Sequence, residues 1–300
     1  MDSRMNAWTW GLLVLLGLIW GGSFFFARIA VQHVPPLTLV FYRLLLAALA
    51  LHVYIAGRFD FYAILKARWR EFLILGFINN ALPHALIFFG QTRIGAGLAA
   101  ILNATTPIWT VLIANYFTSD EKLSPAKIAG CLVGLVGTIV LIGPGLSAGG
   151  EAPLWALLLP VLAAISYGFA ATYGKRFKNV PAPVTAAGQL TASSLIALPL
   201  SLLADRPWTL AAPLDAFLAI LALALLSTAF GYILYFRIMA AAGATNASLV
   251  TLLVPPSAIL LGVLFLGERL ALGEFAGMAL IGFGLVILDG RAYRMLARAA

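Results

Sequence analysis

The residues best suited to bind a polar molecule lie in the third apolar stretch of the chain. Four side chains follow the i, i+4, i+8, i+11 spacing of a single helix face, and a fifth lies beside them. They are Asn80, His84, Phe88 and Gln91, with Asn79 as the neighbour. A buried amide or imidazole without a partner costs on the order of several kcal/mol in hydrocarbon, so this face cannot point to lipid. We expect it to wall a cavity in which Asn79, Asn80 and His84 bind a polar solute; the alternative is hydrogen bonding to neighbouring helices.

A second group of candidate substrate contacts lies in other apolar stretches. In the fourth stretch we expect only Asn103 to be free for a solute, because Thr side chains often bond back to their own helix. Trp20 lies near a span edge, where membership of the interfacial aromatic belt is the alternative. The remaining candidates are Phe24, Tyr167, Tyr232 and Thr251.

Prolines interrupt the stretches that carry several of these side chains. Pro83 is expected to bend the third stretch and Pro107 the fourth, because proline removes one backbone hydrogen bond. In lipid, carbonyls freed in this way survive only against other protein or a water-filled cavity. The ninth stretch repeats the design with Pro255 and Pro256 at its middle. We expect these four prolines to act as hinges or gates around a site at the membrane midplane.

One basic residue, Arg43, falls well inside an apolar stretch. An arginine at the centre of a span costs ~2.5–3.5 kcal/mol on insertion scales, but at this depth the side chain can reach the interface. We interpret Arg43 as a structural clamp on helix-end carbonyls; the alternative is a ligand for the substrate. The corresponding position of the second half falls near Gln189, so the charge is not duplicated.

Catalytic, metal-binding and proton-carrying groups are missing from the apolar stretches. All 11 carboxylates lie in loops or at span ends, so no embedded acid is available to exchange a proton for a cation. The sequence shows no cluster of His, Asp and Glu for a metal, no phosphate-binding loop and no Ser, His and Asp set with credible geometry. We therefore expect no catalytic residue, no metal and no cofactor.

The composition indicates an all-α polytopic membrane protein. Hydrophobic residues make up 62% of the 300 residues, charged residues 10%, and the mean hydropathy is +1.00. So little polar surface could not cover a soluble domain of this size. Ten stretches are each close to the ~20 residues that a membrane-crossing helix needs. They are 8–28, 37–56, 70–91, 97–117, 124–143, 153–173, 183–203, 213–236, 245–266 and 271–289.

Basic residues are distributed unequally between the two sides of these predicted spans. With both termini on one side, that side holds 14 Lys and Arg and the opposite side four, Arg43 being the nineteenth. The positive-inside rule then places both termini in the cytoplasm. The formal charge of +8 thus reflects cytoplasmic loops, not nucleic-acid binding. The first stretch has scarcely any basic n-region and no cleavage site, so we expect it to be a retained span.

The two halves of the sequence repeat each other. Small residues and a proline recur in order at an offset of 148, and a Glu-basic-Leu run and several small residues recur at 147. Five spans in each half force the second half to enter the membrane from the opposite side, which inverts the repeats. We predict ten transmembrane helices around a central cavity, with repeats at 1–145 and 150–291 and a cytoplasmic tail at 292–300. The matched pairs include Gly95 and Gly243, Pro107 and Pro255, Glu121 and Glu268, and Gly137 and Gly284.

Three segments of the sequence resemble the EamA family, a branch of the drug/metabolite transporter superfamily. They are LIWGGSFFFARIA, VFYRLLLAAL and LLVPPSAILLGVLFLGERL. The finer pattern is similar to bacterial exporters of aromatic amino acids of the YddG type. The resemblance implies a central cavity lined by spans 1, 3, 4, 6, 8 and 9, and export of small metabolites without an obligatory ion site. The first-half sequence at 119–123 departs from the Gly-Glu-Arg-Leu form at 267–270, which suggests that the two loops are not equivalent.

Together these features predict an exporter of small metabolites in the bacterial cytoplasmic membrane, with amino acids, including aromatic ones, as favoured substrates. Without a buried carboxylate, it would work by alternating access as a uniporter or facilitator. The alternatives are an exporter of cationic or aromatic drugs and, more distantly, a membrane-embedded enzyme or scaffold. The expected partners are a small-molecule substrate and the lipid bilayer, with no nucleic acid, and the chain is expected to be a monomer or homodimer.

Overall fold

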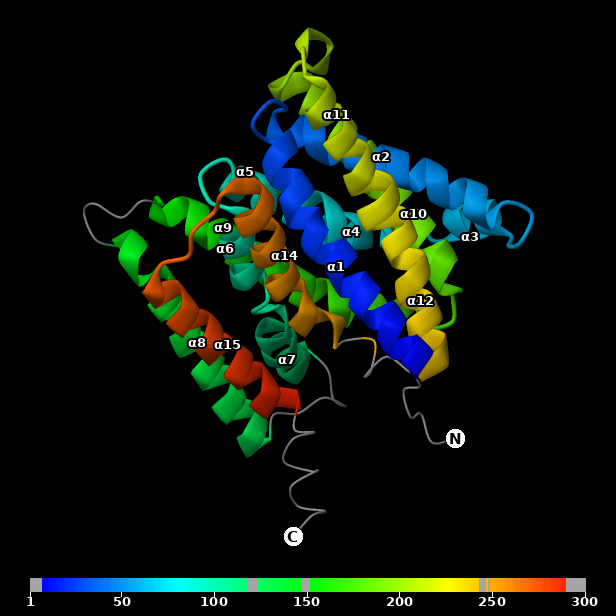
Figure 1. Ribbon diagram of the computed structural model, residues 1–300. Coiled ribbons are helices and arrows are strands. Elements are labelled where there is room, and N and C mark those ends of the chain that lie inside the picture. Colours follow the sequence, from blue (N-terminus) through cyan, green and yellow to red (C-terminus); the bar gives the residue numbers. More distant parts are fainter. Residues whose placement is uncertain (1–6, 118–123, 147–151, 243–246, 248, 290–300) are drawn as a thin grey trace.

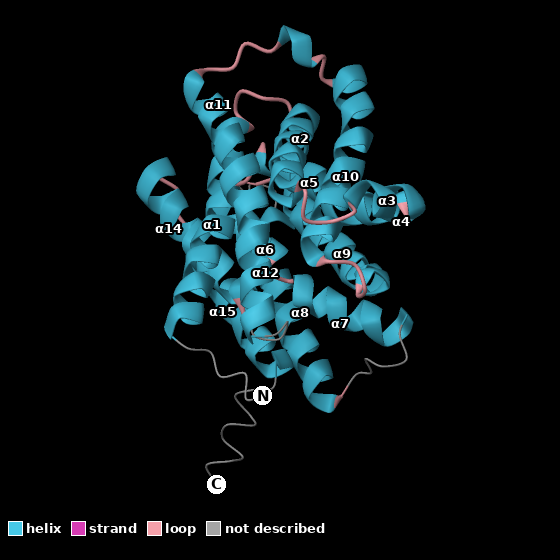
Figure 2. Ribbon diagram, turned by 90° about the vertical axis from the view of Figure 1, so that its right-hand side faces the viewer, coloured by secondary structure: helices cyan, strands magenta, loops and turns pink. Residues whose placement is uncertain are grey.

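A computed structural model describes residues 7–117, 124–146, 152–242, 247 and 249–289 as a bundle of helices (Figure 1). None of these residues lies in a β-strand (Figure 2). Helices are the expected outcome, because an α-helix satisfies its own backbone hydrogen bonds where lipid offers no partner. The all-helical fold class is therefore confirmed for the described part of the chain.

The helical elements follow the apolar runs of the sequence. Most are α-helices, η1 and η4 are π-helical, and η2 and η3 are short 3₁₀ turns. In chain order they are α1 (Ala7–Ala30), α2 (Pro36–Ile55), α3 (Phe61–Ala67), α4 (Trp69–Gly76), η1 (Phe77–Ala81), α5 (Leu82–Gln91), α6 (Ala96–Asn103), α7 (Thr106–Phe117), α8 (Pro125–Leu146), α9 (Leu154–Gly174), η2 (Lys175–Phe177), α10 (Ala182–Ala204), η3 (Pro207–Thr209), α11 (Leu214–Leu221), η4 (Ala222–Phe230), α12 (Gly231–Ala242), α14 (Val250–Leu266) and α15 (Leu272–Asp289).

Seven helical stretches among the described residues are long and apolar enough to cross a bilayer, either as one helix or as consecutive helices. Three shorter apolar stretches accompany them, Lys127–Ile142, Val250–Leu266 and Leu272–Ile287. Each of the ten predicted spans overlaps one of these stretches. The chain is thus a multi-pass membrane protein, while the exact number of ten crossings and the inversion of the halves stay predictions.

Three helix pairs, each formed between the first and the second half of the chain, hold the bundle together. α1 packs on α14, α2 on α10 and α8 on α15, and Figure 1 shows the last pair side by side. A Cβ added at Gly137 of α8 would lie 2.7 Å from the backbone nitrogen of Ile281 in α15. Only a glycine permits two helix backbones to approach so closely. The halves therefore interlock along their length.

The fourth predicted span is not one continuous helix. α6 ends at Asn103 and α7 begins at Thr106, so the bend expected at Pro107 is a break in the helix. Pro107 has no N–H to donate to the carbonyl of Asn103. The hydroxyl of Thr106 donates to that oxygen at 2.7 Å, and Thr105 does the same for the carbonyl of Leu102 at 2.7 Å. The hydroxyl of Thr106 thus replaces the donor that Pro107 lacks, whereas the carbonyl of Leu102 also accepts the backbone N–H of Thr105 at 3.3 Å.

The ninth predicted span, which corresponds to the fourth in the repeat, has a different structure. α14 continues as a helix through both Pro255 and Pro256. The first residues of the predicted range, 245, 246 and 248, lie outside the described residues. The two proline-containing spans are therefore not equivalent, although their prolines match in sequence.

π-helical turns occur in the third and eighth spans, which correspond to each other in the predicted repeat. In η1 the N–H of Leu82 bonds to the carbonyl of Phe77, five residues back. The next carbonyl, of Ile78, would need the N–H of Pro83, which does not exist. Ser166 of α9 donates its hydroxyl to that carbonyl at 2.7 Å. The bend expected at Pro83 is therefore accompanied by a π turn, and a neighbouring helix satisfies the backbone group that is left over.

A carboxylate in the loop after α14 caps a helix of the other half. Gly267 ends α14 in the left-handed region with φ 66°, which glycine adopts without strain. The next residue, Glu268, accepts the N–H of Ala96 at 2.7 Å through Oε1 and that of Gly97 at 3.1 Å through Oε2. A negative charge is favoured there because the N-terminus of α6 is the positive end of the helix dipole.

Candidate functional site

A cavity of about 420 Å³ opens among α1, η1, α5, α6, α7, α9, η4, α12 and α14. These elements belong to spans 1, 3, 4, 6, 8 and 9, the cavity walls that the family resemblance implied, and α2 adds Arg43. Pro107 also lines it, at the break between α6 and α7. Eight of the predicted substrate contacts lie on its wall, although their role in binding stays a prediction: Trp20, Phe24, Asn79, His84, Asn103, Tyr167, Tyr232 and Thr251.

Four residues predicted to bind or to act as hinges are not among those that line this cavity: Asn80, Pro83, Pro255 and Pro256. The register of η1 explains the first. A π turn contains an extra residue, so the side chains before it no longer share the α-helical face of those after it. Asn79, five residues before His84, reaches the cavity, whereas Asn80 is 1% exposed and both of its amide atoms lack a partner among the described residues.

Three polar atoms of cavity-lining residues have no hydrogen-bond partner among the described residues. They are Nδ1 of His84, Oε1 of Gln91 and Oδ1 of Asn103. Each is buried, and a buried polar atom left unpaired costs about 1–3 kcal/mol. Gln91 is itself held in place, because its Nε2 donates to the carbonyl of Phe24 at 2.8 Å. Gln91 as a whole is 0% exposed and His84 7%, so a solute in the cavity would reach these atoms only after the side chains change conformation.

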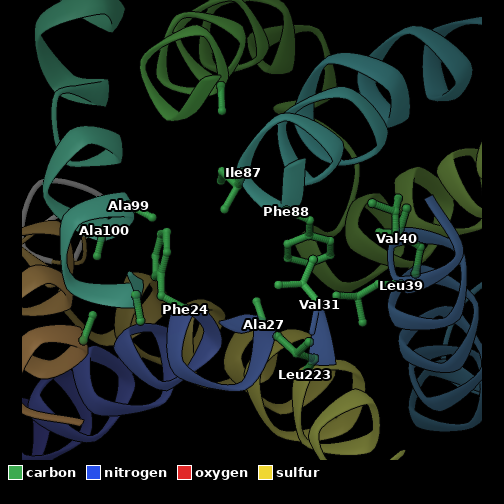
Figure 3. Packing of buried hydrophobic residues seen from close by; sticks show 14 of the residues in the cluster. Phe24, Ala27, Val31, Leu39, Val40, Ile87, Phe88, Ala99, Ala100 and Leu223 are labelled. Carbon is green, nitrogen blue, oxygen red and sulfur yellow. The ribbon is translucent and has the colours of Figure 1, made fainter. Parts of the chain in front are cut away.

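Aromatic rings form another part of the wall. The rings of Trp20 and Tyr235 lie 5.5 Å apart between α1 and α12, and that of Tyr232 is stacked on the ring of Phe236 at 5.8 Å. Figure 3 shows Phe24 rising from α1, with Phe88 on the facing helix α5. Trp20 is therefore part of the cavity wall, while its contact with a substrate stays a prediction.

Arg43 is buried, with 8% of its side chain exposed, and lines the cavity. Its Nε–H donates to the hydroxyl of Thr228 in η4 at 3.0 Å. The guanidinium lies 5.7 Å from the centre of the Phe88 ring, within range of a cation–π contact. The expected clamp on helix-end carbonyls is not what the structure shows, because the hydrogen-bond acceptor is a side chain in the middle of the eighth span.

Gln189 does not line the cavity, but it hydrogen-bonds to two residues that do, and the sequence reasoning did not identify it as a functional group. Its Oε1 accepts the amide N–H of Asn79 at 2.8 Å, and its Nε2 donates to the hydroxyl of Tyr232 at 3.4 Å. Gln189 thus contacts the π turn of the first half, as Arg43 contacts the π turn of the second. The predicted repeat could have identified Gln189, because this residue lies near the position that corresponds to Arg43. The second half lacks the charge of Arg43 but has the corresponding hydrogen bond to a π turn.

A larger cavity of about 660 Å³ lies at the end of the bundle where α14 meets α15. It is lined by loops and helix ends, and it contains charged groups of both signs, including Arg28, Arg93, Asp215 and Glu274. Arg28 donates to the backbone carbonyl of Gln91, the residue whose side chain lines the central cavity. We regard the central cavity as the candidate site because it joins aromatic surface to unpaired polar atoms.

Comparisons with known proteins agree on a membrane transport family. The family model described as the EamA-like transporter family matches residues 8–143 and again residues 154–288. An inner membrane transporter of Escherichia coli (strain K12), YedA, is 27% identical over 292 residues, 96% of this chain and 92% of its own length. An uncharacterized transporter of Archaeoglobus fulgidus is 24% identical over 286 residues, 93% of this chain and 98% of its own.

The fold also has a counterpart among solved structures. A crystal structure aligns with a TM-score of 0.68 at 21% sequence identity, and covers 97% of this chain and 99% of that one. At this identity the likeness concerns the fold alone. YoaV of Bacillus subtilis (strain 168), an uncharacterized transporter, is 24% identical over 274 residues, 91% of this chain and 94% of its own.

Proposed function

Because the chain belongs to the EamA-like transporter family and is a transporter, not an enzyme, we propose that it exports small metabolites across the bacterial cytoplasmic membrane. The proposed substrates are amino acids, including aromatic ones. Both termini would lie in the cytoplasm, as the excess of Lys and Arg on that side indicates. Substrate would enter the central cavity from the cytoplasm and leave on the opposite side.

The observation that carries this proposal is the mixed wall of the central cavity. Its volume of about 420 Å³ is within the range of small-molecule sites. The polar side chains of Asn79, His84 and Asn103 line the wall and would offer hydrogen bonds to the polar part of a solute. The rings of Trp20 and Tyr235 offer a face on which an aromatic side chain can stack, an arrangement worth about 0.5–1.5 kcal/mol beyond burial.

The proposed mechanism is alternating access without proton coupling. Among the described residues, no Asp or Glu lines the central cavity, so this part of the chain offers no carboxylate there to carry a proton. The helix break before Pro107 lets α6 and α7 change their relative angle, and the prolines of α14 would serve the second half in the same way. Transport would then follow the gradient of the solute.

The proposal is tested by exchange of labelled L-phenylalanine in vesicles that contain the purified protein. We expect uptake that depends on unlabelled amino acid inside and that survives collapse of the proton gradient. Tyr235→Ala should reduce this exchange, whereas Tyr116→Ala, which truncates a ring that is 81% exposed, should not. Strict dependence on the proton gradient would refute the mechanism, and absence of exchange for every amino acid in a panel would refute the function.

The second candidate function is export of cationic or aromatic drugs, which the aromatic wall of the cavity also favours. Cations bind to aromatic faces, and a cavity rich in rings needs no carboxylate to hold them. Competition of phenylalanine exchange by tetraphenylphosphonium distinguishes the two. Strong competition by this cation would favour drug export over amino-acid export.

A further inference from the structure

Arg43 places a positive charge on the wall of the central cavity with little compensation from the protein. A guanidinium has five N–H donors, and within the described part of the chain Arg43 uses one of them, to Thr228. The described residues that line the cavity include no carboxylate. Several described carboxylates accept backbone N–H groups away from the cavity. Among them, Glu268 accepts the N–H of Ala96 at the start of α6, and Asp205 accepts the N–H of Thr38 at 2.7 Å.

A buried cation is costly unless an anion pairs with it, because water is replaced by a medium of low dielectric constant. Burial of Arg43 carries this cost, and among the described residues no carboxylate forms an ion pair with it in the cavity. Its repeat counterpart, Gln189, shows that a neutral side chain can make the corresponding contact with a π turn. The charge is therefore not required for the interhelical contact, and it calls for an explanation at the cavity.

We propose that Arg43 binds the carboxylate of the transported solute and so makes a carboxylate the required feature of the substrate. This inference rests on the proposed function and narrows it: amino acids and other small carboxylic acids fit, and amines do not. Thr228 and the ring of Phe88 orient the guanidinium, leaving its terminal nitrogens for a two-point contact with the carboxylate.

The neutral polar atoms of the wall complete the recognition of a zwitterion. Asn103 is a partly exposed residue of the wall whose amide oxygen has no donor among the described residues, and a rotation of that amide would present it to the ammonium of an amino acid. A solute that carries only an ammonium group would satisfy this oxygen but would meet the charge of Arg43. The same charge opposes cationic drugs, so it separates the two candidate functions.

The inference is tested first on the unchanged protein, by competition against labelled L-phenylalanine. The competitors are 3-phenylpropionate, which keeps the carboxylate, and phenethylamine and phenylalaninamide, which lack it. We expect 3-phenylpropionate to compete within about tenfold of phenylalanine, and the two amines to be weaker by ~10- to 100-fold, as for the loss of a charge-assisted pair. Equal competition by the acid and the amines would overturn the inference while leaving amino-acid transport intact.

Variants then connect the preference to the residue. Arg43→Gln should remove the preference for 3-phenylpropionate over phenethylamine, and Arg43→Lys should restore part of it, because lysine keeps the charge without the planar fork. Arg58→Gln removes an exposed charge just after the same helix, and should leave the preference unchanged. Thr228→Val should weaken the preference without abolishing it. A preference that persists in Arg43→Gln would overturn the assignment.

Thermal stabilisation by the same compounds separates the two possible failures. If the protein transports no amino acid but is stabilised by 3-phenylpropionate and not by phenethylamine, in an Arg43-dependent way, the carboxylate site stands and the export proposal fails. If phenylalanine is exchanged but neither competition nor stabilisation depends on the carboxylate, export stands and the role of Arg43 fails.

Discussion

Removing the carboxylate of Glu268 is predicted to destabilise the protein strongly, because this side chain joins the loop after α14 to the N-terminus of α6. Each of its two hydrogen bonds to the N–H groups of Ala96 and Gly97 involves an ionised group and is worth about 1.5–3 kcal/mol. The dipole of α6 adds about 0.3–1 kcal/mol. Because Glu268 is partly exposed, we take the lower end of each contribution and expect Glu268→Ala to lower the free energy of unfolding by about 3 kcal/mol.

The assay is thermal unfolding in detergent, followed by the fraction of protein that stays monodisperse. The matched control is Glu274→Ala, since the Oε2 of Glu274 accepts the N–H of Ala271 at 2.7 Å, an exposed contact within one half. The control should cost about 0.5–1 kcal/mol, as for an ordinary helix cap. We expect Glu268→Ala to lower Tm by about 5–10 °C. A Tm no lower than that of the control would refute the importance of the contact.

A second variant, Gly262→Ala, tests the contact of Glu268 with α6, and we expect its effect on stability to be opposite to that of an ordinary Gly→Ala substitution in a helix. A Cβ at Gly262 would lie 2.5 Å from the Oε2 of Glu268. Gly→Ala inside a helix normally stabilises by roughly 0.5–1 kcal/mol, but here the methyl group would displace the carboxylate from its donors. We therefore expect Gly262→Ala to destabilise the wild type and to become neutral or stabilising when Glu268 is already alanine. Additive effects of the two substitutions would contradict this reasoning.

Two further predictions concern the π turn of the third span. Ser166→Ala should lower the free energy of unfolding by about 1–2 kcal/mol, because the carbonyl of Ile78 loses its donor. Urea unfolding in detergent measures this change, and an unchanged unfolding midpoint would contradict the prediction. Gln189→Leu should raise the KM for phenylalanine exchange about tenfold, because Asn79 loses the oxygen that accepts its amide N–H. Gln189→Glu keeps an acceptor for Asn79, so its KM should rise less. If both variants raise KM equally, the hydrogen bond to Asn79 is not what matters.

The sequence predicts the helical stretches well because the membrane leaves few alternatives. An apolar run of about twenty residues must satisfy its backbone internally, so its place in the chain is set by hydropathy alone. The same argument locates most of the cavity wall: polar and aromatic side chains in the middle of a span avoid lipid and gather at the centre. Asn103 and Tyr232 are on the cavity wall for this reason.

Local detail inside the spans is set by partners that are distant in sequence. Spacing alone favoured Asn80 as the cavity residue, since Asn80 and His84 are four residues apart. The π turn displaces Asn80 and brings in Asn79. That turn leaves a carbonyl for which Ser166, 88 residues away, is the donor, and no window of the third span contains this information.

Arg43 and Gln189 differ in residue type but make corresponding hydrogen bonds in the two halves of the chain. Both side chains lie on the second helix of their half, and both hydrogen-bond to a π turn of the other half. The predicted repeat accounts for the same interhelical contact in both halves, and only one copy of it carries a charge. Both side chains join the halves, and the charge is the difference between them. Under the carboxylate-binding proposal, that charge serves substrate recognition, whereas the position of Arg43 in the fold follows from the predicted repeat.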